Sequence, residues 1–125
     1  MRKFLALTAV LTAVLAPAGA EAMPVSLFLQ KAQALQAKGM LALFASDYKL
    51  LKAEVTNASA QLRAERLAAR AAGRRPAYCP PQDQGSLDSN ELLAAFRAIP
   101  PAVAARTEVR DALRALLARK FPCAP

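Results

Sequence analysis

The residues best suited to chemistry in this 125-residue chain are its two cysteines, Cys79 and Cys123. The chain has no histidine, which excludes a Ser-His-Asp or Cys-His nucleophile, a histidine metal ligand and a histidine pH switch. Two thiolates alone cannot complete a four-ligand zinc site. The pair can therefore be a structural disulfide or a redox couple. The lack of a C-x-x-C spacing favours the disulfide, provided that the chain folds in an oxidising compartment.

The first twenty-two residues have the pattern of a cleaved signal peptide. Arg2 and Lys3 precede an apolar run over 4–15, and small residues follow Pro17. The run is shorter than the roughly 20 residues that cross a bilayer as a helix, so we expect no transmembrane anchor. Two A-x-A motifs place the cleavage after Ala20 or Ala22. We expect a periplasmic or secreted protein with one domain over residues 23–125.

The carboxylates downstream of this leader include no pair that needs a catalytic explanation. Asp88 and Glu91 have the three-residue spacing of a capping box. Glu108 and Asp111 lie near the start of the last predicted helix, where the helix dipole favours acidic side chains. We therefore expect no enzymatic activity, no cofactor and no metal.

A basic stripe is the first candidate binding feature. Its members are Arg63, Arg66, Arg70, Arg74 and Arg75. The first four have helical spacing, and arginine suits bidentate contacts with carboxylates or phosphates. The stripe is either a docking face for an anionic partner or a solvated helix face. The net charge of +8 would suit nucleic acid in the cytoplasm. Because we expect export, and because no aromatic residue lies among these arginines, we expect no nucleic-acid binding.

The proline-rich segment 76–87 is the second candidate. It carries Tyr78, Gln82, Asp83 and Gln84. A loop held by a disulfide loses little entropy on binding, so this segment is a plausible exposed contact for a protein partner. The alternative is a plain connector that holds the bridge.

The elements that position these residues are predicted to be helices. The chain has 31 alanines and only 4 glycines, and no stretch alternates with period two. We expect an all-α bundle of about four helices stapled by one disulfide. The predicted helices run over 27–38 with Ser26 as N-cap, 47–72, 89–98 and 106–121, with a short helical turn over 40–45. Glycines at 39 and 73 are the expected stops.

Apolar spacing predicts which faces of these helices are buried. The predicted core positions of the first helix are Leu27, Ala34 and Leu35, and those of the long helix are Tyr48, Leu51, Val55, Ala58 and Leu62. A Cys79–Cys123 bridge would make the C-terminal half a stapled helical hairpin.

Short motifs in the C-terminal half resemble a known family. They are Tyr78-Cys79-Pro80-Pro81, Gly85-Ser86-Leu87 before an amphipathic helix, and Lys120-Phe121-Pro122-Cys123 after a second one. Residues 77–123 thereby resemble the Rap/Tai immunity proteins, which protect bacteria with type VI secretion from peptidoglycan amidase toxins. The resemblance implies a structural Cys79–Cys123 disulfide and hydrophobic anchors at Leu92, Phe96, Leu113 and Phe121. It also implies that a protruding loop, here 80–87, binds the toxin. Upstream, the chain lacks the further cysteines of that family.

The expected function is therefore that of an exported helical binding protein that neutralises an amidase effector, with a homodimer left open as its assembly. Two other classes also fit the sequence. One is a periplasmic chaperone or stress protein, because small exported helical domains with one disulfide also serve in that role. The other is a structural domain that its basic face holds to the cell envelope.

Overall fold

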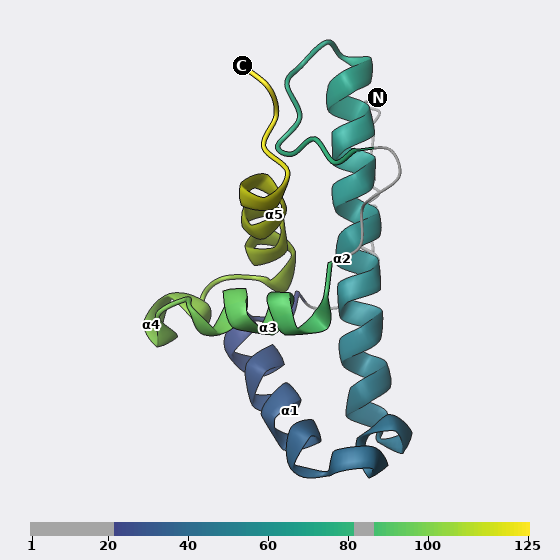
Figure 1. Ribbon diagram of the computed structural model, residues 1–125, viewed down its shortest axis with the longest axis vertical. Coiled ribbons are helices and arrows are strands. Elements are labelled where there is room, and N and C mark those ends of the chain that lie inside the picture. Colours follow the sequence, from purple (N-terminus) through teal and green to yellow (C-terminus); the bar gives the residue numbers. More distant parts are fainter. Residues whose placement is uncertain (1–21, 82–86) are drawn as a thin grey trace, which may run out of the picture.

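The fold is organised around one long helix. The computed structural model describes residues 22–81 and 87–125. Its elements are α1 (Val25–Ala37), the 3-10 helix η1 (Gly39–Phe44), α2 (Ser46–Ala71), α3 (Ser89–Arg97), α4 (Pro101–Ala104) and α5 (Val109–Lys120). The helix α2 runs the length of the molecule, α1 and α5 pack against it, and α3 packs against α1 and α5 (Figure 1). The prediction of an all-α fold is confirmed within these ranges.

Export and membrane anchoring bear on residues that the structure describes only in part. The predicted signal peptide lies outside the described residues, except for Ala22. Among the helices of the described part, none has the length and apolar character needed to cross a bilayer.

The two helix stops predicted at glycine are confirmed. Gly39 has a φ of 57° and Gly73 a φ of 69°, a left-handed conformation that glycine adopts without the steric cost of a Cβ. Gly39 separates α1 from η1, and Gly73 follows the end of α2. The predicted bounds of α2 differ from the observed ones by a single residue at each end.

The predicted starts of α1 and α5 are wrong, and the same contact explains both. Pro24 and Glu108 form an isolated antiparallel bridge, in which the Val25 amide donates to the Thr107 carbonyl at 2.8 Å. This pairing starts α1 at Val25, so Pro24 and not Ser26 is the N-cap residue. It also keeps residue 108 extended, so α5 begins at Val109 and the separate turn α4 occupies the chain after Pro100.

The capping box predicted at the start of α3 is half right. The Asp88 side chain accepts a hydrogen bond from the Asn90 amide at 2.9 Å. The Glu91 side chain does not accept the hydrogen bond from the backbone amide of Asp88 that a full capping box requires. Its carboxylate instead accepts from the Lys120 Nζ at 2.7 Å, which ties α3 to the end of α5.

The core lies where α1, α2, α3 and α5 meet. Its most deeply buried side chains are Val25, Leu62, Phe96, Val109 and Leu113. Of the positions implied by the resemblance, Leu92, Phe96 and Leu113 are buried, and Phe121 packs partly buried against them. In α2, Leu51, Ala58 and Leu62 are buried as predicted, Val55 is half-buried and Tyr48 is exposed.

The predicted core face of α1 is wrong except at Leu35. Leu27 and Ala34 are exposed, whereas Val25, Phe28 and Ala32 are buried with Leu35. The ring of Phe28 packs edge-on against that of Phe96, with 5.5 Å between the centroids. This aromatic contact and the bridge at Pro24 set the rotation of α1, and both partners are distant in the sequence.

The disulfide is confirmed and ties the loop before α3 to the end of α5 as expected, but the last helices do not form the expected hairpin. Cys79 is bonded to Cys123 at an S–S distance of 2.02 Å. The Cys79 amide also donates to the Phe121 carbonyl at 2.8 Å. The bridge fastens the segment after α2 to the end of α5, while α3 crosses below α5 (Figure 1). The stapled unit is therefore α2 with α5, not a hairpin of the last two helices.

A candidate binding groove along α2

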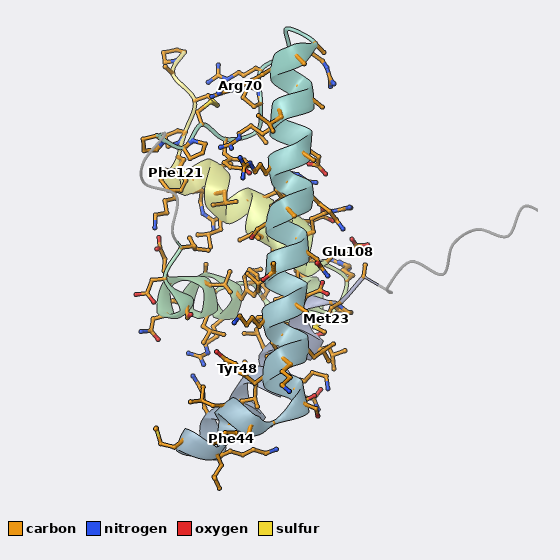
Figure 2. All side chains as sticks on the ribbon, turned by 90° about the vertical axis from the view of Figure 1, so that its right-hand side faces the viewer. Met23, Phe44, Tyr48, Arg70, Glu108 and Phe121 are labelled. Atoms are coloured by element: carbon orange, nitrogen blue, oxygen red, sulfur yellow. A yellow bond between two sulfur atoms is a disulfide. The ribbon has the colours of Figure 1, made fainter. Side chains whose placement is uncertain are left out.

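A groove of about 1160 Å³ runs along one side of α2, opposite α1, α3 and segment 78–81. Apolar side chains from α1, α2, α3, α5 and the segment after α5 line it. Those side chains include Phe28, Leu35, Leu51, Val55, Leu92, Leu93, Leu117 and Phe121. Figure 2 shows Tyr48 and Arg70, both lining residues, near the two ends of α2 and on the same side of it. The groove therefore extends along most of the helix.

The wall that α2 contributes is a regular row of polar and basic side chains. The row consists of Lys52, Thr56, Ser59, Arg63, Arg66 and Arg70. The alternating spacing of four and three residues keeps all six on one face of the helix. At 1.5 Å per residue, the row is about 27 Å long. The result is an apolar groove with a cationic edge along Arg63, Arg66 and Arg70, toward the C-terminal end of α2.

The five-arginine stripe predicted from the sequence is divided by the end of α2. Arg63, Arg66 and Arg70 line the groove. Arg74 and Arg75 follow the turn at Gly73 and line a smaller hollow of about 370 Å³. Arg75 donates from Nη2 to the Cys123 carbonyl at 2.8 Å, so it is held at the disulfide and away from the row.

Tyr78 contradicts the expectation of an exposed contact residue. It is 6% exposed and belongs to the core. The guanidinium of Arg66 lies over its ring, 5.2 Å from the centroid, which is the geometry of a cation–π contact. The adjacent disulfide holds the backbone at Cys79 and so keeps this ring against α2. The other predicted loop contacts, Gln82, Asp83 and Gln84, lie outside the described residues.

On the side of α2 that faces α5, Glu65 is paired with a cation of α5. Arg114 of α5 contacts Glu65 at 3.0 Å and Asp111 at 2.7 Å. The hydrogen bond that Arg114 donates to the Asp111 carboxylate raises the pKa of Arg114, burial lowers it, and Glu65 raises it further. Arg114 therefore stays cationic wherever the protein is folded.

The arginines of the groove are left without such compensation. Among residues 22–81 and 87–125, no ion pair involves Arg63, Arg66 or Arg70. The Nε of Arg66 is buried and has no hydrogen-bond partner within the same ranges. A buried donor without a partner costs free energy until an acceptor reaches it. The groove wall thus has positive charge and donor capacity available for a ligand.

The groove combines apolar surface with positive charge, a lining suited to binding. Its serine and threonine hydroxyls, those of Thr56, Ser59 and Ser89, have no histidine to activate them, because the chain contains none. No group of three potential metal ligands occurs in the described part of the chain. Apolar lining with a cationic edge favours a ligand that is itself apolar on one face and acidic on the other.

The arginines of this wall were predicted from their spacing, but the groove was not. The signal for the rest of the row was present, because the spacing of Arg63, Arg66 and Arg70 continues backwards through Ser59, Thr56 and Lys52. The opposite wall could not be inferred in this way. It comes from α1 and α3, whose orientation depends on contacts between residues distant in the sequence.

Comparisons with known proteins give no match: no family model, no curated protein and no solved structure is similar to this chain.

Proposed function

We propose that this protein is an exported, non-catalytic binding protein whose α2 groove receives an acidic, amphipathic segment of a protein partner. The observation that carries the proposal is the apolar groove beside three arginines that form no ion pair among residues 22–81 and 87–125. Arginine forms bidentate hydrogen bonds with carboxylates, and apolar side chains along the groove supply the buried area. The length of the row, about 27 Å, corresponds to about five turns of helix and suits a peptide segment better than a small metabolite.

The resemblance of residues 77–123 to immunity proteins supports a peptidoglycan amidase toxin as the partner. Pro80, Pro81 and Leu87 line the groove as well. A partner seated there would therefore contact both flanks of the loop that the resemblance implicates. Neutralisation would follow from occupying the toxin surface, with no bond made or broken by this chain. Location in the periplasm, where such toxins act, is part of the same proposal and requires that the leader be cleaved.

The test is co-expression with an amidase encoded next to the gene for this chain. We expect a stable complex and protection of the cells from lysis. The paired substitution Arg63→Glu with Arg70→Glu should weaken the complex by about tenfold or more, because it places repulsive charge at a contact that favours acids. Arg119→Glu, which reverses one charge at an exposed position of α5, is the control for each single groove substitution and should have little effect.

Two results would overturn the proposal. One is the absence of both complex and protection. The other is a complex that tolerates the groove substitutions as well as it tolerates Arg119→Glu, because the partner would then bind elsewhere. Retention of α-helical circular dichroism in each variant excludes a trivial loss of fold.

A further inference from the structure

The turn between α1 and α2 exposes an apolar tip, formed by Met40, Leu41, Leu43 and Phe44. Met40 and Phe44 are 81% and 85% exposed, and Leu41 and Leu43 are also exposed. All four belong to η1, which has no buried residue. These exposed side chains contribute no burial energy to the fold. A contiguous group of exposed apolar residues is typical of an interaction surface.

The apolar tip lies at one end of the molecule, far from the disulfide. Figure 2 shows Phe44 at the lower end, and Figure 1 places the C-terminus at the opposite end. The 3-10 turn projects beyond both helices that it connects. A flat surface could therefore approach the tip without contacting α3 or α5.

Basic residues surround the apolar tip. Lys38 precedes η1, and Lys49 and Lys52 lie in the first two turns of α2; all three are exposed. The nearest carboxylate in the sequence, Asp47, is already paired with Lys31, whose Nζ lies 2.9 Å from Asp47 Oδ1. This end of the molecule therefore combines exposed apolar side chains with an excess of positive charge.

We infer that the apolar tip is a docking surface for an anionic lipid bilayer. Apolar side chains that enter the interface between headgroups and acyl chains, with lysines at the headgroup level, are the two contributions that hold peripheral proteins on such membranes. Charge complementarity favours this occupant over a second copy, since tip-to-tip contact would bring two sets of lysines together. The small area of a six-residue turn also falls well below the about 800 Å² per partner of a standard protein interface.

This surface is separate from the upper, arginine-lined part of the groove. Lys52 belongs to both the wall and the tip region, whereas the four apolar tip residues do not line the groove. A protein docked by its tip would keep Arg63, Arg66 and Arg70 available. The inference consequently does not depend on the proposed protein partner, and either can fail alone.

The experiment uses Phe44→Trp as a reporter, because the chain has no tryptophan of its own. The variant is purified from a host that exports it, and its N-terminus is read by mass spectrometry. Vesicles of phosphatidylglycerol should shift its fluorescence to shorter wavelength, and brominated acyl chains should quench it. Vesicles of phosphatidylcholine should do neither. An unchanged spectrum on phosphatidylglycerol would overturn the inference.

Matched variants in the Phe44→Trp background separate the two contributions. Met40→Ser with Leu41→Ser should reduce vesicle binding by about tenfold or more, while Leu67→Ser, at another exposed apolar residue of α2, should leave it unchanged. Lys38→Gln with Lys49→Gln should reduce it severalfold, and more at low salt, whereas Arg119→Gln should not. Sedimentation of the same variants tests the competing occupant. A dimer lost in Met40→Ser with Leu41→Ser, without any change in vesicle binding, would assign the tip to a second copy.

Discussion

The two sides of α2 differ in how completely their charges and apolar groups are satisfied. Towards α5, Leu62 is buried, Glu65 is paired with Arg114, and the disulfide fastens the segment after α2 to the end of α5. Towards the groove, Arg63 and Arg70 face a partly open apolar lining, and neither forms an ion pair within the described part of the chain. The buried positions of α2 and the polar row of the groove wall each recur at steps of three and four residues. One helix therefore carries a packed face and a face that is open to a ligand. Stability is concentrated on the first face and binding capacity on the second.

Removing the disulfide, which belongs to the packed side of α2, should cause the largest loss of stability. The bridge closes a sequence separation of 44 residues. On the chain-entropy model, Cys79→Ser with Cys123→Ser should lower the free energy of unfolding by about 4 kcal/mol. Urea denaturation followed by circular dichroism measures the loss. A change below about 1 kcal/mol would mean that the noncovalent contacts between α2 and α5 suffice.

A truncation on each side of α2 should give the next largest difference. Leu62→Ala removes a side chain that is 1% exposed and should cost about 3 kcal/mol through lost burial and a residual cavity. Ser59→Ala, one turn earlier on the groove wall, should change stability by less than about 0.5 kcal/mol. Equal losses in urea denaturation would contradict the distinction between the faces.

Breaking the ionic contact on the α5 side should have a smaller effect. Arg114→Gln should lower the free energy of unfolding by about 1 kcal/mol, because it removes the ion pair with Glu65 and leaves Asp111 only its longer contact with Arg110, at 3.8 Å. The folded-state pKa of Arg114 is raised, so its contribution is complete below the ordinary pKa and is lost only as pH rises through the raised one. The difference between Arg114→Gln and the parent chain should therefore stay constant from about pH 6 to 10. A steady decline across that range would indicate that another group is involved.

The smallest effect should have the opposite sign. Arg66 and Arg70 are four residues apart on one helix face, a spacing at which like charges repel by a few tenths of a kcal/mol. Arg70→Gln should therefore stabilise the free protein slightly, and more at low salt than at high salt. A lower thermal unfolding midpoint for Arg70→Gln than for the parent chain at low salt would show that Arg70 has a structural partner.

The sequence predicted best what local chemistry decides. The bounds of α2 follow from a long amphipathic pattern that ends at Gly73, and the Asp88 cap from the residue type at a helix start. The disulfide was inferable because the leader-like segment indicates an oxidising compartment and only two cysteines are present. These features depend on neighbours in the chain or on composition.

The features that were missed depend on contacts between distant residues. In α1, alanine and leucine occur on several sides of the helix, so the apolar pattern is too weak to define its buried face. The contact of Phe28 with Phe96 and the pairing of Pro24 with Glu108 decide it instead. Burial of Tyr78 likewise depends on Arg66, which lies on another element. The arginines of the candidate site were predictable from spacing, but the apolar lining opposite them was not.

The bridge at Pro24 has a consequence for the order of events during biogenesis. Residue 24 pairs with residue 108, so the first segment of the fold finds its partner only when nearly all of the polypeptide has been delivered. Until then, Met23 and Val25, which the finished fold buries, lack their backbone hydrogen-bond partners at residues 109 and 107.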